Sequence, residues 1–152
     1  MFNLSNQEPI IFHYKKCFIK NSNGEDEEVW RPLAHISIGK RKVGMTALID
    51  TGSDKTLSYL KPWGELVGFD LDEYEGEPEE IRGLCGSTKA WSKHTDLWIG
   101  DHLFNVPIYW IVDPFDQKSE YQMILGRRNI FNHFHIIFDE GDKKVYFYHK
   151  SN

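Results

Sequence analysis

The residues best suited to chemistry lie where an apolar run meets a carboxylate and a tight turn. Residues 43–49 are mainly apolar, and Asp50, Thr51 and Gly52 follow them directly. A glycine at this place lets the backbone approach another chain or a bound peptide without a Cβ in the way. For a bare Asp-Thr-Gly tripeptide, an aspartate that merely ends a strand is the better interpretation. The residues around it decide between the two.

Three motifs, in one order along the chain, resemble those of the retropepsin-like (retroviral-type) aspartic proteases. Residues 48–53, Leu-Ile-Asp-Thr-Gly-Ser, match the first signature of that family without a departure. Residues 124–127, Ile-Leu-Gly-Arg, resemble the second signature, which leads into a short helix. Between them, residues 81–87 resemble the glycine-rich hairpin flap. The resemblance covers about residues 29–148 and leaves residues 1–28 as an additional N-terminal strand region.

The resemblance implies an aspartic endopeptidase that acts on an extended peptide without a cofactor. Its chemistry needs two carboxyl groups about 3 Å apart, one to deprotonate water and one to polarise the carbonyl, and such a pair titrates as a unit. The chain has a single Asp-Thr-Gly, since Asp101, Asp113 and Asp139 are not followed by Thr-Gly. The dyad therefore requires a second copy of Asp50, which predicts a symmetric homodimer.

Roles for the neighbouring residues follow from the same resemblance. Thr51 is expected to hydrogen-bond across the dimer axis to the opposite loop, which Gly52 and Ser53 help to form. Asp54 and Arg127 fall where the family carries an acid and an arginine that pair, and the arginine fork suits bracing a loop against a helix. The alternative is that either residue is a solvated surface charge.

The hairpin expected over residues 80–99 resembles the flap of these enzymes. Its tip holds the residues expected to cover the substrate: Gly83, Leu84, Cys85 and Gly86. The two glycines would let the tip open for a peptide and close over it to exclude water. A plain hairpin turn without a gating role is the alternative. At the second signature, Arg128 departs from the Asn that is frequent in viral members.

Two other kinds of site receive little support. His133 and His135 would share one face of a strand, but no cysteine or acidic residue accompanies them at metal-ligand spacing. A serine nucleophile is not indicated, because Gly-x-Ser-x-Gly is absent. We therefore expect neither a metal nor a cofactor.

Composition limits the partners and the location. The 152 residues include 18 Lys+Arg and 23 Asp+Glu, a net charge of -5, so nucleic acid is not an expected partner. Cys17 and Cys85 are too few for a disulfide framework, which favours a reducing compartment. Because neither a signal-peptide pattern nor a run of about twenty apolar residues is present, we expect a cytoplasmic protein without a membrane partner.

The elements that must position Asp50 are mainly strands, because β-branched and aromatic runs alternate with Gly, Asn and Asp clusters. Strands are predicted over 10–20, 29–38, 43–49, 106–112 and 123–126, with a last hairpin over 135–139 and 143–148. Residues 61–80 are expected to be a surface connection with at most a turn or two of helix, and 127–132 a short helix. We predict a single mainly β domain over 1–152. The resemblance implies a closed or partly open β-barrel of the acid protease type, a single-lobe subunit with one short C-terminal helix.

Two other functions remain open. The first is a non-catalytic peptide-binding or dimerisation module, which would have no physical need for an intact Asp50 loop. In the second, the chain is a barrel domain of a larger assembly, and a different protein supplies the second carboxyl of the dyad.

Overall fold

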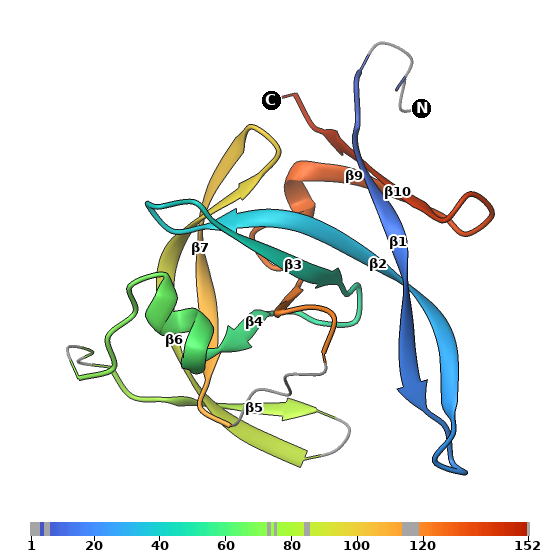
Figure 1. Cartoon of the computed structure of the whole chain (residues 1–152). Coiled ribbons are helices and arrows are strands. Elements are labelled where there is room, and N and C mark those ends of the chain that lie inside the picture. The colour runs from blue at the N-terminus through green and yellow to red at the C-terminus, as the bar shows by residue number, and fades with distance from the viewer. Residues whose placement is uncertain are drawn as a thin grey trace.

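The computed structural model describes residues 4, 7–72, 74, 76–83, 86–113 and 119–151. Within these residues all strands join one ten-stranded sheet (Figure 1). The strands are β1 (Ile10–Lys20), β2 (Asp26–Ile38), β3 (Val43–Ile49), β4 (Thr56–Tyr59), β5 (Glu79–Gly83), β6 (Gly86–Ile99), β7 (His102–Ile111), β8 (Met123–Leu125), β9 (Phe134–Asp139) and β10 (Lys144–His149). Two short helical turns, η1 (Leu60–Gly64) and η2 (Phe131–His133), interrupt them. Within the same residues, no helix has the length and apolarity to span a bilayer.

Six of the strands close into a ring of hydrogen-bonded neighbours. The order is β6-β7-β4-β8-β3-β2, and β2 returns to β6 through the pairs Ser37–Trp98 and Ile38–Leu97. Two residue pairs are a narrow closure, so the ring is not a regular barrel. The predicted mainly β architecture is confirmed.

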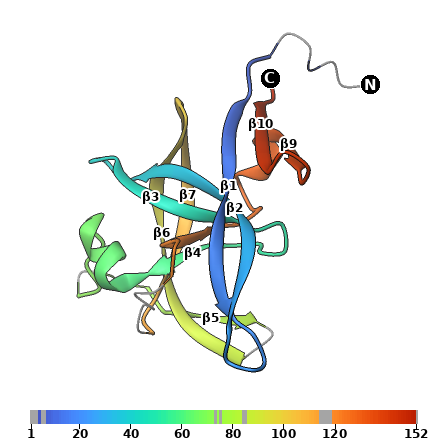
Figure 2. The same cartoon turned by 45° about the vertical axis from the view of Figure 1, so that its right-hand side comes forward.

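The first strand connects this ring to both ends of the chain. Its first part pairs with β10, from Ile10–Phe147 to His13–Lys144. Its second part pairs with β2, from Tyr14–Pro32 to Lys20–Asp26. Because β10 also pairs with β9, the strands β1, β10 and β9 form an outer layer beside the ring. Figure 2 shows the β1–β2 hairpin reaching away from the ring toward the end where the β5–β6 hairpin lies.

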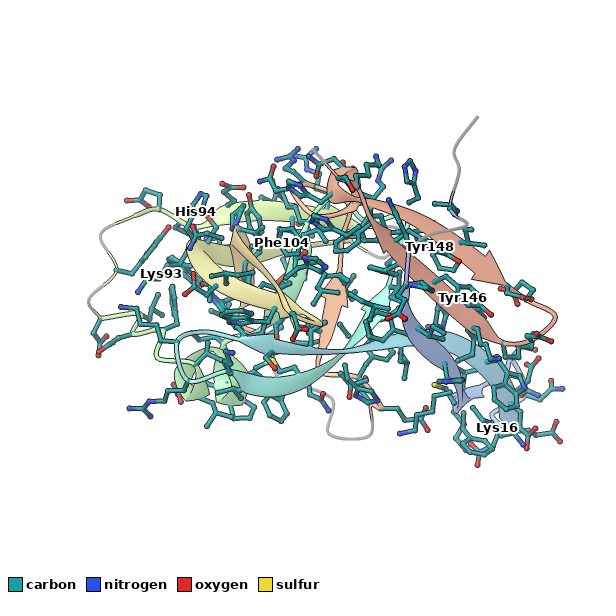
Figure 3. The ribbon with its side chains drawn as sticks, turned by 90° about the horizontal axis from the view of Figure 1, so that it is seen from above. Lys16, Lys93, His94, Phe104, Tyr146 and Tyr148 are labelled. Carbon is teal, nitrogen blue, oxygen red and sulfur yellow. The ribbon has the colours of Figure 1, made fainter. Side chains whose placement is uncertain are left out.

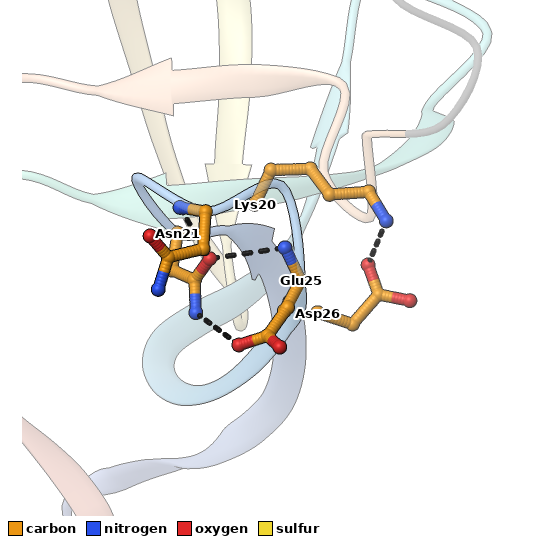
Figure 4. Close-up of polar contacts among 5 residues, drawn as sticks. Lys20, Asn21, Glu25 and Asp26 are labelled. Atoms are coloured by element: carbon orange, nitrogen blue, oxygen red, sulfur yellow. Dashed lines mark hydrogen bonds and ion pairs between the residues drawn. The ribbon is translucent and has the colours of Figure 1, made fainter.

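Asn21 holds the turn of the β1–β2 hairpin. Its Oδ1 accepts hydrogen bonds from the backbone N–H groups of Asn23 (2.9 Å) and Glu25 (3.0 Å). Asn21 Nδ2 donates to the Glu25 carboxylate at 3.3 Å, and an ion pair of 2.6 Å joins Lys20 to Asp26 (Figure 4). Asparagine favours such local side-chain bonds, so this sequence cluster fixes where the hairpin turns.

The core fills the ring and extends under the outer layer. Ile38, Leu97 and Ile108 are fully buried inside the ring, as the period-two pattern of their strands requires. The outer layer is attached by aromatic rings, since Phe147 of β10 contacts Phe12 of β1 at 5.3 Å and Phe134 of β9 at 5.2 Å between centroids. Burial of such a side chain stabilises the fold by roughly 1.5–3 kcal/mol, so these contacts hold both termini to the ring. On β10, Tyr146 and Tyr148 lie side by side (Figure 3).

The helix expected over residues 127–132 needs a correction. The chain there makes a turn followed by the single 3-10 turn η2, Phe131–His133. Asn129 has a φ of 63°, which is outside the right-handed helical region and prevents a continuous helix. The expectation for residues 61–80 was closer, because η1 supplies one short helical turn there.

Candidate active site

The two family signatures lie side by side in the fold. β3 and β8 run parallel, with Ala47 opposite Met123 and Ile49 opposite Leu125. Where β3 ends, the backbone N–H of Asp50 donates to the carbonyl of Leu125 at 3.1 Å. The strand that carries the aspartate is thus anchored to the strand that carries the second motif.

The loop after β3 holds the Asp50 carboxylate. The backbone N–H of Gly52 donates to Asp50 Oδ1 at 2.9 Å, and the N–H of Ser53 donates to the Asp50 carbonyl at 3.3 Å. A Cβ on Gly52 would lie 3.3 Å from the same Oδ1, which is tight. The Ser53 hydroxyl donates to the carbonyl of Lys55 at 2.8 Å and holds the second half of the loop. One carboxylate oxygen is therefore fixed by the backbone, and the side chain remains partly exposed.

Gly126 makes the closest approach in the site. An added Cβ would lie 2.2 Å from the carbonyl oxygen of Lys55, a distance that no side chain tolerates. The N–H of Gly126 donates to the hydroxyl of Thr56 at 3.1 Å, and Thr56 is 3% exposed. Neither Thr56 nor this role of Gly126 was predicted from the sequence, although a glycine directly after a short apolar strand signals a close backbone approach.

Asp54 and Arg127, the charges expected to pair, do form an ion pair between Arg127 Nη2 and Asp54 Oδ1. Their side chains are 61% and 54% exposed, so the pair contributes at most about 1 kcal/mol. The backbone adds two further links, because Arg127 N–H donates to Ser53 O and Arg128 N–H donates to Asp54 O, both at 2.9 Å. The chain after Gly126 is thus fastened along the whole Asp50 loop.

A hairpin faces this loop. β5 pairs with β6 up to Gly83 opposite Gly86, and Gly86 has a φ of 128°, which favours glycine. Leu84 and Cys85, predicted at its tip, lie outside the described residues. Lys55 connects the Asp50 loop to the hairpin through an ion pair with Glu79 of β5 at 3.3 Å. Its ammonium also lies 4.8 Å from the ring centre of Tyr109 on β7.

Between the loop and the hairpin is an open cleft of about 810 Å³. Its walls come from three places: the loop and β4 (Asp50, Gly52, Ser53, Asp54, Lys55, Leu57), the hairpin (Ile81, Arg82, Gly83, Gly86, Ser87, Thr88), and Ile111, Ile124 and Arg128. Thr51 is exposed beside this cleft but does not line it. The lining combines apolar side chains, among them Leu57, Ile81, Ile111 and Ile124, with the Asp50 carboxylate.

The His133 ring and the Cys17 thiol do not line this cleft in the described part of the chain. No group of three His, Cys, Asp or Glu residues there is arranged to hold a metal ion. His133 belongs to η2 and packs against Phe104 at 5.0 Å between ring centres. Cys17 is a buried free thiol, and burial, together with a hydrogen bond to Glu120, raises the pKa of Cys17 to about 11.

The fold is that of the retropepsin-like aspartic proteases. The retropepsin-like aspartic protease from Rickettsia conorii superposes with a TM-score of 0.59 at 15% identity, covering 100% of both chains. The EIAV protease in complex with the inhibitor HBY-793 matches with a TM-score of 0.46 at 20% identity, over 64% of this chain and 82% of that one. No family model and no curated protein sequence matches the chain. The Rickettsia match includes residues 1–28, which the sequence resemblance left outside.

Proposed function

We propose that the chain is an aspartic endopeptidase whose catalytic dyad is Asp50 and the Asp50 of a second copy. The observation that carries this proposal is the position of the Asp50 carboxylate. It stands at the end of a buried strand, one oxygen held by the Gly52 N–H, and it faces a peptide-sized cleft. Among the described residues that line the cleft, the other acid is Asp54, and it forms an ion pair with Arg127.

In the proposed mechanism the two carboxyl groups share one proton. The ionised Asp50 takes a proton from a water molecule as that water attacks the scissile carbonyl carbon, and the protonated Asp50 donates a hydrogen bond to the carbonyl oxygen. Proton transfer to the leaving amine then breaks the C–N bond and restores the shared proton. One chain supplies half of this machinery, so the homodimer is a condition of activity.

The substrate is proposed to be an extended peptide. β5 stands at the end of the strand order, so it is an edge strand that offers backbone groups for strand addition. The β5–β6 hairpin would act as the flap, closing over the peptide through the conformational freedom of Gly83 and Gly86. Thr51, exposed beside Asp50, is proposed to contact the second copy across the dimer axis.

The deciding experiment incubates the protein with a denatured protein mixture between about pH 3 and 7 and sequences the cut sites. A pepstatin-type inhibitor and an Asp50→Asn variant serve as controls. Cleavage that both controls abolish supports the proposal. Peptide binding without cleavage would instead favour the non-catalytic module.

The remaining expectations belong to the same proposal. A single domain over residues 1–152 and a location in the cytoplasm accord with one sheet that joins all described strands and with a free thiol at Cys17. Light scattering of the purified protein would test whether the partner is a second copy or a different protein.

A further inference from the structure

The cleft beside Asp50 has an uneven distribution of charge. The charged side chains that line it are Asp50, Asp54, Lys55, Arg82 and Arg128. Three of them have a partner of opposite charge: Asp54 binds Arg127, Lys55 lies 3.3 Å from Glu79, and Arg82 lies 3.2 Å from Glu80. Within the described ranges, Asp50 and Arg128 make no ion pair. Among the described residues of the cleft, Arg128 is thus the cation that no ion pair offsets, and it shares the cleft with the Asp50 carboxylate.

The backbone of Arg128 is fixed to the loop that carries Asp50. Its N–H donates to the carbonyl of Asp54 at 2.9 Å, and the preceding N–H of Arg127 donates to Ser53 at the same distance. Asn129, with its φ of 63°, then turns the chain away. The Arg128 side chain is exposed and lines the cleft. These backbone hydrogen bonds fix the position of its Cα relative to the Asp50 loop.

We propose that Arg128 selects substrates that carry an acidic side chain near the scissile bond. This inference rests on the proposed function and names the substrate class of the same site. A guanidinium is permanently charged, and its planar donors fit a carboxylate in a two-point hydrogen bond. Lys55 and Arg82 offer less attraction, because Glu79 and Glu80 already offset their charge.

The expected selectivity is moderate. A charge-assisted hydrogen bond at an exposed position corresponds to about a fivefold preference for Glu over Gln at the position that reaches Arg128. Gln is the matched comparison, since it keeps the shape and removes only the charge. Symmetry gives the dimer two copies of Arg128, so the preferred acid can lie on either side of the cut.

The test measures binding separately from turnover. Two pools of fluorescein-labelled decapeptides, identical except that every Glu in one is Gln in the other, are titrated with the Asp50→Asn protein and followed by anisotropy. We expect about fivefold tighter binding of the Glu pool. Adding Arg128→Gln should remove the difference, and Arg128→Lys should retain part of it. Arg41→Gln, which removes an exposed charge outside the cleft, should leave it unchanged.

Equal binding of the two pools to the Asp50→Asn protein would overturn the inference. A Glu preference that survives the Arg128→Gln substitution would also overturn it. This includes the result that Arg128→Gln changes the dimer dissociation constant but not the preference. Wild-type cleavage of the same pools distinguishes a failure of the Arg128 role from a failure of the proposed activity. Cleavage without a Glu preference would sink only the role of Arg128, whereas Glu-selective binding without any cleavage would sink only the proposed activity.

Discussion

Gly126 and Lys55 touch backbone to backbone, with the position of a Gly126 Cβ only 2.2 Å from the Lys55 carbonyl oxygen. This contact holds the end of β8 against the chain that leaves the Asp50 loop. It is a contact between backbones and involves neither the Asp50 carboxylate nor the Lys55 ammonium, so unfolding measurements report its contribution to stability.

We expect Gly126→Ala to destabilise the fold by about 2–4 kcal/mol, because the backbone must move to admit one methyl group. Urea unfolding followed by tryptophan fluorescence measures the change. Gly44→Ala is the matched control, since nothing lies within 4 Å of an added Cβ there. A loss below about 0.5 kcal/mol, the usual range for surface substitutions, would contradict the close approach.

Asp50→Asn should abolish peptide hydrolysis and leave the unfolding free energy and the dimer nearly unchanged. The amide keeps the shape and can still accept the bond from Gly52, but it cannot exchange a proton with water. Asp101→Asn, an exposed aspartate in the turn before β7, is the control and should keep full activity. Turnover by the Asp50 variant at even about a tenth of the wild-type rate would rule out the dyad.

Specific activity should fall on dilution below the dimer dissociation constant, because a single chain holds one carboxyl. Mixing wild type with an excess of Asp50→Asn should lower the activity further, since mixed dimers lack one ionisable group. Peptide cleavage rates at known dimer fractions, measured by sedimentation, provide the check. A constant activity per chain in both experiments would point to a monomeric catalyst.

The Asp54–Arg127 ion pair predicts a small coupling energy. Asp54→Ala and Arg127→Ala should each lower stability or dimerisation, and the double variant should lose less than the sum by at most about 1 kcal/mol, because both side chains are more than half exposed. Strict additivity would mean that the backbone bonds alone join the two segments. The coupling should also shrink in high salt.

His149 makes stability sensitive to acid. Burial lowers the pKa of His149, and the nearby His102 and His133 lower it further. The unfolded chain therefore takes up a proton at a higher pH than the folded chain does. Stability should fall as the pH drops from the ordinary histidine range near 6.5 toward the lowered value.

The melting temperature between about pH 7 and 5 tests this. His149→Gln should flatten the dependence, whereas His94→Gln, on an exposed histidine of β6, should leave the slope as in wild type. A slope equal in all three proteins would show that His149 does not carry the effect.

Where strands are long and alternate regularly, the sequence predicted them well. The expected strands over 10–20 and 43–49 coincide with β1 and β3. β4 was missed because Thr56–Tyr59 is four residues long and gives too short a pattern to recognise. The helix expected at 127–132 was wrong because local propensity does not reveal that the N–H groups of Arg127 and Arg128 donate hydrogen bonds to the Asp50 loop.

In the candidate site too, some features could be predicted from local sequence and others depend on distant contacts. Asp50 and the two signatures could be read from residue types and order alone. The ion pairs of the cleft depend on which strands become neighbours, and that is set by pairings between distant parts of the chain. Glu79 reaches Lys55, for example, only because the β5–β6 hairpin folds back over the loop.

The pairing of Ile10 with Phe147 also has a kinetic consequence. β10 follows β1 by more than a hundred residues, so during much of synthesis the first part of β1 has no neighbour on that side and exposes an unsatisfied strand edge. Closing a loop of more than a hundred residues is slow, and we expect the outer layer to assemble after the ring. Nascent chains stalled before β10 should therefore be more prone to aggregation and proteolysis than the finished protein.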